Sequence, residues 1–455
     1  MKSSSDTLEA FLTEHRALSK EFKKLDDAIE TYRKKLTRQV QLLIAQKLVT
    51  LDTPVEDLGF HQLEALVKKH ESSLDCQVFR LEDLRANHNC QACKTNPDTT
   101  VGAKPTHVDG SETPTIPGLF PSGPVTLESV EEHNFRYITG GTTCGIVNAP
   151  GIKGGDQLAL FIWYPDFHSE TPERCARLQR LAYLIWLGKT YATPCTRNGP
   201  HQAVPPNLRG SMSVAGQRKD LNTRIPWAKY AMPKRFKRRG RQGWVDFQEE
   251  YLPEIGTIMN MFLLESAAKI VVKKTHQLMG NCNLPPLEAT TINKKDWNPS
   301  LGCNITFSFN RFSNACHFDK DEHCYVYSAY VFVDSQTGEL ITDTARISNY
   351  MKGGFLIWPD LHLALKIIDC TGVVFLFWRG THERHCTITS EILDNSIIRI
   401  GTSIQVNKRL FTSVKRYYDQ LYLIEKWEVE GGVGPSPQPP VLPQGLGSFG
   451  VGDEA

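Results

Sequence analysis

Residues 303–333 read CNITFSFNRFSNACHFDKDEHCYVYSAYVFV, which is two apolar runs joined by a polar segment. Both runs, 303–309 and 324–333, are rich in β-branched and aromatic residues and therefore favour β-strands. The segment between them contains His317-Phe318-Asp319. In an extended chain, residues i and i+2 project from the same face, so the imidazole and the carboxylate can bind one metal ion together. The stretch thus predicts two strands with two metal ligands between them.

Five more strand-like runs follow downstream, separated by turn residues. They are residues 354–358, 363–368, 373–378, 386–389 and 397–406. Seven short strands at this spacing predict a jelly roll, also called a double-stranded β-helix, at about residues 300–410. Upstream, residues 251–275 have the length and the apolar face of a helix that packs on the outside of the strands. We therefore expect an α+β fold, in which flanking helices surround the jelly roll within a globular domain at 127–430.

The first 75 residues predict a separate helical arm. Between Leu8 and Leu43, apolar residues recur at steps of three or four among dense Lys, Glu and Asp. Thr53 and Pro54 then mark the start of a second helix. Residues 1–75 are therefore expected to form a helical hairpin or coiled-coil arm with a structural role, through which two chains could form a homodimer.

Residues 76–126 and 431–455 have compositions typical of linkers and tails. The first segment becomes rich in Thr, Pro, Gly and Ser, and the second is rich in Pro and Gly. Neither can bury enough apolar surface to fold alone, so we expect a linker and a disordered tail. Cys90 and Cys93 supply half of a zinc-binding pattern, so a Cys/His zinc site within the linker is an open alternative to unbound thiols.

The composition excludes several classes of protein. The chain has 455 residues, enough for about three structural units. Its 52 Lys and Arg against 50 Asp and Glu leave a net charge of +2, which excludes a uniformly basic nucleic-acid coat. No run approaches about 18 consecutive apolar residues and the start is polar, so we expect a soluble intracellular protein without a membrane contact. The 12 scattered Cys are expected to be reduced thiols.

A third metal ligand must come from a distant strand, and two histidines qualify. His382 and His385 both follow the apolar run 373–378. His385 is the favoured candidate because it opens the strand-like segment His-Cys-Thr-Ile-Thr, where the backbone is held. His382 lies in the preceding loop and remains the alternative. Two imidazoles and one carboxylate form the facial triad of non-haem Fe(II) sites, which leaves positions open for a co-substrate and dioxygen.

Arg399 follows His385 by 14 residues and lies between β-branched residues of a strand that is expected to be buried. A buried guanidinium needs an anionic partner, because an unpaired charge in the core is costly. An internal Asp or Glu can supply that anion, and so can the distal carboxylate of a dicarboxylate such as 2-oxoglutarate. Ser403 projects from the same strand face and is expected to add a hydroxyl. The ordered set of H-x-D, distant His and Arg predicts a dioxygenase that uses Fe(II), 2-oxoglutarate and O2.

The same residues carry a resemblance to a known family. His317-Phe318-Asp319, the segment 354–378, His385-Cys-Thr and Arg399 resemble the catalytic core of the TET/JBP family of nucleic-acid base dioxygenases, with an order and spacing similar to a fungal TET homologue. The resemblance covers residues 210–410. Family members often carry Arg-x-Ser at the co-substrate arginine, whereas here the third position is Gly401. The long Cys-rich region of the animal members is also lacking from this sequence.

The resemblance implies that the substrate is a methylated base in DNA. Oxidation of the methyl group of 5-methylcytosine would give the hydroxymethyl form and, on repetition, the formyl and carboxyl forms. The same chemistry on N6-methyladenine gives an unstable hemiaminal and hence demethylation. Since a base inside a duplex cannot approach an iron ion in a barrel, base flipping is required. Asn310 and Arg311, just upstream of the metal pair, are expected to reach the flipped base.

A basic segment is compatible with this substrate. Seven cations and no acid occur between residues 229 and 241, and four aromatic residues interleave or flank them. Such a segment can neutralise phosphates and stack bases, or it can act as a nuclear-localisation patch or a solvated loop. We expect DNA binding and a nuclear location. The cations are Lys229, Lys234, Arg235, Lys237, Arg238, Arg239 and Arg241, and the aromatic residues are Trp227, Tyr230, Phe236 and Trp244.

Two other functions remain open from the sequence alone. Prolyl hydroxylases share the metal-ligand spacing, so a 2-oxoglutarate-dependent protein hydroxylase is the first alternative. The second is a non-catalytic scaffold that dimerises through the helical arm and only binds nucleic acid. Loss of the seven cations should separate a DNA substrate from a peptide substrate, and loss of His317 and Asp319 should separate an enzyme from a scaffold.

Overall fold

The computed structural model describes the greater part of the globular domain. The described residues are 77–80, 119–120, 123–139, 144–147, 158–195, 203–220, 226–238, 240–289, 297–369 and 371–429. The predicted helical arm at 1–75, the pair Cys90 and Cys93, and the predicted tail at 431–455 lie outside them and stay predictions. Within the described segments, no helix is both long and apolar enough to cross a membrane.

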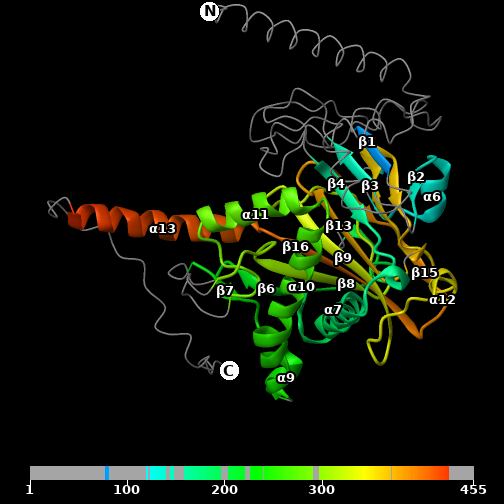
Figure 1. The fold of residues 1–455 in the computed structure, drawn as a ribbon, viewed down its shortest axis with the longest axis horizontal. Helices are drawn as coiled ribbons and strands as arrows, with labels where there is room; N and C mark the ends of the chain where they lie inside the picture. Colours follow the sequence, from blue (N-terminus) through cyan, green and yellow to red (C-terminus); the bar gives the residue numbers. More distant parts are fainter. Residues whose placement is uncertain are drawn as a thin grey trace, which may run out of the picture.

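The described chain consists of runs of strands and runs of helices, and strands β10 to β16 follow one another without an α-helix between them (Figure 1). The strands are β1 (Gln77–Arg80), β2 (Arg136–Ile138), β3 (Cys144–Val147), β4 (Leu158–Trp163), β5 (Thr193–Pro194), β6 (Ser211–Arg218), β7 (Ala228–Lys229), β8 (Asn304–Phe309), β9 (Tyr325–Asp334), β10 (Met351–Gly353), β11 (Leu356–Trp358), β12 (Leu363–Leu365), β13 (Val373–Arg379), β14 (Cys386–Thr387), β15 (Ser390–Ile392) and β16 (Ile397–Gln405). The helices are α6 (Leu127–Glu132), α7 (Pro172–Tyr191), α8 (Lys234–Arg238), α9 (Arg241–Asp246), α10 (Leu252–Glu265), α11 (Lys269–Asn281), α12 (Thr344–Ser348) and α13 (Lys408–Val429).

The strands form one large sheet and two smaller ones. The order in the large sheet is β1-β3-β4-β13-β9-β16-β8-β6-β5, with β7 paired to β6. The second sheet has the order β14-β11-β12-β2, and β10 pairs with β15. The central strand β9 runs antiparallel to both β13 and β16. Strands distant in sequence, such as β4 and β13, are neighbours, as a jelly roll requires. The structure confirms the α+β fold and the jelly-roll core.

The two faces of the large sheet follow from side-chain alternation along its strands. On β13, Val373, Phe375 and Phe377 belong to an apolar cluster that includes residues of α7 and α10. Their neighbours Val374 and Leu376 belong to a second cluster that includes residues of β11 and β12. The large sheet is therefore the middle layer, with helices on one face and the small sheet on the other.

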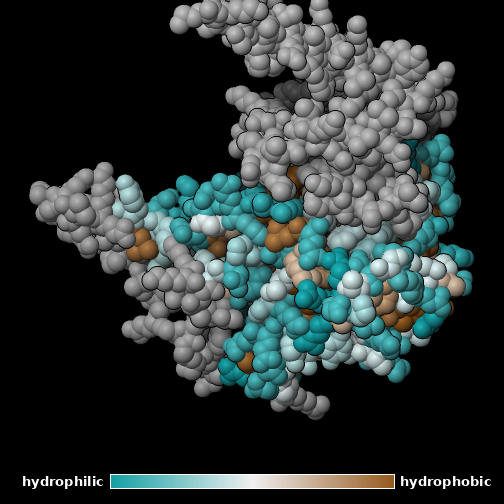
Figure 2. Space-filling view, in the orientation of Figure 1, coloured by the Kyte–Doolittle hydropathy of each residue, from teal (hydrophilic) through white to brown (hydrophobic). Residues whose placement is uncertain are grey.

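Helices α7 and α10 cover the first of these faces (Figure 1). Helix α7 begins sharply because the hydroxyl of Thr171 accepts a hydrogen bond from the N–H of Arg174 and Pro172 occupies the first turn. Its buried residues, which include Leu178, Leu181 and Ile185, pack on the sheet. The outer surface on this side is mostly hydrophilic with small scattered apolar spots, as expected of a surface layer (Figure 2).

On both β16 and β8, the face toward the helices is apolar and the opposite face is mostly polar. On β16, Ile398, Ile400 and Ile404 join the helix-side cluster, whereas Ser403 and Gln405 project from the opposite face and line a cavity. On β8, Thr306 and Ser308 also line this cavity. The small sheet packs against β4, β13 and β9 rather than against β8 and most of β16. The polar face of β8 and β16 therefore forms the floor of an accessible pocket.

The structure corrects two expectations about the elements. Residues 251–275 do not form one helix, because α10 ends at Glu265 and α11 begins at Lys269. The hydroxyl of Ser266 breaks the helix by accepting a hydrogen bond from the N–H of Ala268. Residues 77–80, within the expected linker, form β1 and pair in parallel with β3. Seven cysteines are free thiols, as expected: Cys175, Cys195, Cys282, Cys303, Cys316, Cys324 and Cys386.

Helix α7 lies so close to the sheet at Gly188 that this position is expected to be sensitive to substitution. A Cβ atom at this position would overlap the ring of Phe307 on β8. We expect Gly188→Ala to lower the free energy of unfolding by about 1–3 kcal/mol, because the ring or the helix must move. Chemical denaturation measures the change. Gly280→Ala on α11 is the matched control, since no atom lies within 4 Å of its added Cβ. Equal stability of the two variants would contradict this packing.

Candidate metal and co-substrate site

Two distant segments meet in an antiparallel bridge that frames the site. His317 and His385 lie directly opposite each other. The backbone N–H of His317 donates to the carbonyl of His385 at 3.1 Å, and the reverse bond measures 3.0 Å. On one side, Thr387 donates its N–H to Oδ1 of Asn314 at 2.7 Å. On the other side, Asp319 donates its N–H to the carbonyl of Gly380 at 2.8 Å. Both segments are therefore held in one register.

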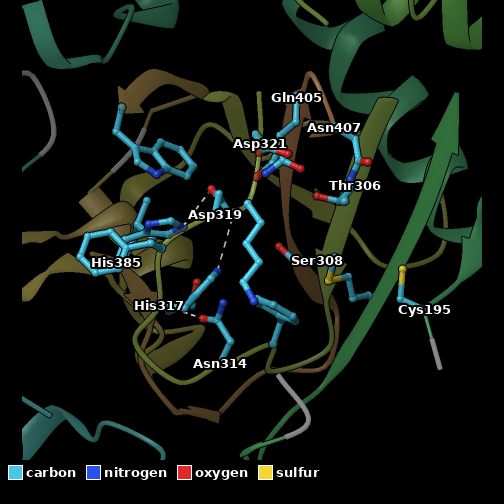
Figure 3. Close-up of a pocket in the computed structure, with 18 of the residues that line it drawn as sticks. Cys195, Thr306, Ser308, Asn314, His317, Asp319, Asp321, His385, Gln405 and Asn407 are labelled. Carbon is cyan, nitrogen blue, oxygen red and sulfur yellow. Dashed lines mark hydrogen bonds and ion pairs between the residues drawn. The ribbon is translucent and has the colours of Figure 1, made fainter. Parts of the chain in front are cut away.

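The bridge brings three metal-binding side chains together (Figure 3). Nε2 of His317 lies 3.6 Å from Oδ1 of Asp319, and Nε2 of His385 lies 3.5 Å from Oδ2 of the same carboxylate. One ligand atom from each of the three residues lies within 4.8 Å of the others. Among the described residues, no other group of three or more His, Cys, Asp or Glu is arranged in this way.

Both imidazoles are oriented by the backbone. Nδ1 of His317 lies 2.9 Å from the carbonyl of Ala315, and Nδ1 of His385 lies 3.0 Å from the carbonyl of Glu383. A carbonyl can only accept, so Nδ1 is the donor in each ring and Nε2 is the nitrogen left to face a metal ion. Trp378 packs edge-on against the ring of His385, with 5.1 Å between the ring centroids. The two Nε2 atoms are thus prepared as ligands.

The charge states fit a metal ion. Burial lowers the pKa of His385 to about 4, so its imidazole is neutral at neutral pH. Burial opposes ionisation of Asp319, but the adjacent His385 and His317 outweigh it and lower the pKa of this carboxyl. Oδ2 of Asp319 is buried and accepts no hydrogen bond. A buried carboxylate oxygen without a donor is what a bound cation would satisfy.

His382, the alternative third ligand, is not part of the cluster. Its Nδ1 lies 2.7 Å from the hydroxyl of Thr381, and its backbone N–H donates to the carbonyl of Arg379 within the turn that precedes β14. The structure therefore favours His385 as the third metal ligand, because His385 begins a bridged segment whereas His382 lies in a turn. The sequence argument for choosing His385 rested on the same difference.

Arg399 is fully enclosed on β16, with 3 % of its surface exposed. Nη2 donates to the carbonyl of Phe312 at 3.1 Å, and Nη1 donates to the carbonyl of Gly354. Gly354 is required there, because a Cβ would overlap Nη1 of Arg399. Among the described residues no carboxylate pairs with this guanidinium, and burial lowers its pKa. Carbonyl groups do not neutralise a cation, so the site fits an anionic ligand.

A cavity of about 870 Å³ adjoins the triad. Figure 3 shows the triad on one side and Thr306, Ser308, Gln405 and Asn407 on the other. Ser403 also lines the cavity, opposite Thr306 in the register of β16 with β8. The sequence analysis did not identify Asp321, Gln405 and Asn407. Counting by two from Ser403 would have placed Gln405 on this face.

Several predicted substrate-binding residues lie elsewhere. Asn310 and Arg311 form an exposed turn, each with a positive φ (54° and 63°), and do not line the cavity. Lys234, Arg235 and Lys237 are exposed on α8, but none lines the cavity either. The remaining basic positions are Lys229, half-buried on β7; Arg241, exposed at the start of α9; Arg239, outside the described residues; and Arg238, whose side chain is not described. Their contacts with DNA stay predictions.

The aromatic residues of the basic segment have a different role from the expected one. Trp227 and Trp244 have only 7 % and 5 % of their surface exposed, and Phe236 stacks on Tyr191 with 5.1 Å between ring centroids. The expectation that Trp227 and Trp244 stack on bases is therefore wrong. They belong to the core, because proximity to cations in sequence does not show which way a ring points.

The site combines three metal ligands that face a cavity with a buried arginine that has no carboxylate partner among the described residues. This combination is typical of oxygenases that use Fe(II) and 2-oxoglutarate. Residues 171–390 match the family model of the Tet-like 2OG-Fe(II) oxygenase superfamily, which confirms the resemblance. Among solved structures, the chain is similar to a prolyl hydroxylase in complex with a hypoxia inducible factor oxygen degradation domain peptide fragment from Trichoplax adhaerens, at 11 % identity and a TM-score of 0.26, covering 56 % of this chain and 86 % of that one. No curated protein matches.

Fe(II), 2-oxoglutarate and O2 are the cofactor and co-substrates of this superfamily. When bound, they supply the oxidising chemistry, in which 2-oxoglutarate is decarboxylated to succinate. His317, Asp319 and His385 would hold the ion from one side and leave the side toward the cavity open. Arg399 would hold a carboxylate of 2-oxoglutarate through charge-assisted hydrogen bonds. The protein thus supplies ligands, an anion partner and a shaped cavity.

The cluster predicts which histidine binds metal. We expect His385→Ala to weaken the binding of Mn²⁺ or Fe²⁺ by more than about 100-fold, since even the partners of metal ligands are worth about 10–100-fold. His382→Ala, three residues away, should leave the affinity unchanged. Anaerobic calorimetric titration of both full-length variants measures the difference. If His382→Ala lost the metal and His385→Ala retained it, the ligand set described above would be incorrect.

Proposed function

We propose that this chain oxidises the methyl groups of methylated bases in DNA. Its substrate would be 5-methylcytosine, converted to the hydroxymethyl form and then to the formyl and carboxyl forms, with N6-methyladenine as a second substrate that is demethylated. The observation that carries the proposal is a set of unpaired cations around the cavity that adjoins the metal-binding triad. We name this set, Lys320, Lys408 and Arg409, the cationic rim.

The cationic rim comes from two segments that are joined by backbone bonds. Asp321 and Asn407 form an antiparallel bridge, and the N–H of Glu322 donates to the carbonyl of Val406 at 3.0 Å. Lys320 precedes the first segment of this bridge, and Lys408 and Arg409 follow the second. The bridge therefore places all three cations beside one opening.

The rim cations occupy electrostatically unfavourable positions. All three are exposed, and none forms an ion pair in the described part of the chain. Lys408 and Arg409 begin the long helix α13, whose first turn contains no acid. The N-terminal end of a helix is its positive end, so cations there are disfavoured. Placement against the helix dipole and without acidic partners supports a role in binding an external polyanion such as a DNA backbone.

The cavity is compatible with a flipped nucleotide. Its volume of about 870 Å³ lies within the usual range of small-molecule sites, about 300–1,000 Å³. Its wall combines rings, such as Phe312 and Trp378, with polar groups, such as Asn314 and Gln405. Bases are held in such pockets by stacking and by hydrogen bonds to their edges. A base paired inside a duplex could not enter, so base flipping is part of the proposal.

The chain's own residues would place one methyl group beside the metal. The triad would fix the ion, Arg399 would orient the co-substrate, and the cavity wall would orient the base. Each oxidation consumes one O2 and one 2-oxoglutarate and releases succinate and CO2. Hydroxylation of an N-methyl group gives a hemiaminal, which loses formaldehyde and leaves the free amine. We further propose methylated DNA as the partner and the nucleus as the location; a homodimer through residues 1–75 stays a prediction.

Nucleoside mass spectrometry tests the proposed substrate directly. Full-length protein is incubated with Fe²⁺, 2-oxoglutarate, O2 and DNA that contains both methylated bases. We expect hydroxymethylcytosine, a loss of N6-methyladenine, and succinate formation that depends on DNA. Asp319→Ala should form none of these products, because it lacks a metal ligand. Succinate formed only with added peptides would instead identify a protein hydroxylase. Equal results for the wild type and Asp319→Ala would indicate a non-catalytic scaffold.

The cationic rim predicts a specific salt dependence. We expect Lys408→Gln/Arg409→Gln to weaken binding to methylated duplex DNA and to reduce the slope of log K against log salt by about 2, since each phosphate contact contributes about 0.9. Lys415→Gln/Arg416→Gln is the matched control: it removes the same charge from the same helix face, about 10 Å further from the cavity. Fluorescence anisotropy at several salt concentrations measures both. Equal slopes for the two double variants would contradict a role of the rim.

A further inference from the structure

Two cysteines adjoin the metal-binding histidines, one on each segment of the antiparallel bridge. Cys316 precedes His317 and Cys386 follows His385, so the bridge between the histidines also sets the two cysteines opposite each other. Sγ of Cys316 lies 3.0 Å from Sγ of Cys386, although the two residues are 70 positions apart in the sequence. The two thiols are therefore in direct contact.

Their place in the bridge suits a disulfide. His317 and His385 exchange both backbone hydrogen bonds, so the adjoining pair, Cys316 and Cys386, is a non-hydrogen-bonded pair. Opposite Cα atoms in such a pair are about 4.5 Å apart, which lies within the range of about 4.4–6.8 Å that disulfides span. Strand β11 also holds the backbone of Cys386, because Ile357 pairs with this residue. The two sulfurs can thus join with little backbone movement.

The thiols and the imidazoles lie on different faces of the bridge, because side chains alternate along extended segments. Cys386 belongs to the apolar cluster of the small sheet, and Cys316 packs against that cluster. His317 and His385 instead line the cavity. Neither thiol belongs to the metal-binding group of His317, Asp319 and His385. Oxidation of the thiols therefore leaves the three ligand side chains chemically unchanged.

The two thiols differ in access. Cys316 is half-buried, whereas Cys386 is fully buried. A small oxidant therefore reaches Cys316 first, and Cys386 is in position to react with the oxidised sulfur. A second thiol at this position converts a sulfenic acid into a disulfide, which a reductant can reverse. The pair thus offers both an attacked thiol and a resolving thiol.

We propose that Cys316 and Cys386 are a redox-active pair, which a peroxide converts into a disulfide that joins the two segments carrying the metal ligands. The sulfur of Cys316 attacks hydrogen peroxide: an S–O bond forms, the O–O bond breaks, and the leaving hydroxide takes the thiol proton to become water. The sulfur of Cys386 then displaces the hydroxyl group: the S–S bond forms, the S–O bond breaks, and a second water leaves. The peroxide gains two electrons, and the two thiols together lose two electrons.

The disulfide acts as a clamp on the metal site. In the reduced protein, backbone hydrogen bonds join the segments of His317 and His385, and such bonds open locally. Separation of the two segments would move the ligands apart and release a bound ion. A covalent bond one residue from each histidine restricts that separation. This role does not depend on whether the substrate is DNA or another polymer.

Peptide mapping by mass spectrometry tests the bond itself. Full-length protein is treated with hydrogen peroxide in the presence of a chelator, which prevents iron-driven side reactions, and is digested without reduction. We expect two peptides linked through Cys316 and Cys386, which dithiothreitol separates. Cys175→Ala is the matched control and should form the same link. Cys175 is also half-buried, but its Sγ donates to the carbonyl of Phe167.

Thermal melting and metal release test the clamp. We expect the linked form to melt about 5 °C or more above the reduced form, because a bond across a loop of this length constrains the unfolded chain. After loading with Mn²⁺, the linked form should lose the ion to a chelator about threefold or more slowly, since the bridge opens less often. Peroxide-treated Cys316→Ala should show neither change. The proposal is overturned if peroxide produces sulfinic acids without the link, or if the linked form loses Mn²⁺ as fast as the reduced form.

Discussion

The site depends on the paired backbone bonds between His317 and His385. Each imidazole is aimed by a carbonyl two residues before it, at Ala315 and Glu383, so the orientation of both rings is a property of the local backbone. What the local backbone cannot supply is the distance between the two rings. The antiparallel bridge supplies it, and it also sets the position of Asp319 through the next backbone bond along the segment. The metal centre is therefore an extension of strand pairing rather than a property of loops.

The large sheet gives this bridge a rigid support because it has a different partner on each face. Apolar residues of β13 alternate between the helix layer and the small sheet, so the strand is fixed from both sides. Strand β16 has apolar contacts along its helix side, whereas on its other face only Ile397 joins the cluster of the small sheet. Its other face carries the enclosed Arg399 at one end and cavity-lining polar residues toward the other. One strand thus joins the part of the site that binds the co-substrate to the part that is open to a substrate.

The sequence predicted those parts of the fold and site that depend on local pattern. The seven strand runs were recognised because β-branched and aromatic residues cluster between turn residues, and His385 was preferred because it opens a strand. The errors arose where the answer depends on which residues meet in space. Trp227 and Trp244 are core residues although they flank cations. The register between strands is required to predict that Tyr330 lies opposite Gly401 and that Lys320 and Lys408 line one cavity. No periodicity in one sequence contains that register.

The division of β16 and β8 into a packed face and a free face has a consequence for how such a domain changes over time. Thr306, Ser403 and Gln405 belong to neither of the apolar clusters that hold the sheet between its two layers. Exchange of these side chains would alter what the cavity accepts at little cost to folding, whereas the isoleucines between them are confined by the helices. Substitution of these polar side chains can therefore change the substrate that the cavity accepts, whereas packing constrains the scaffold that carries the triad.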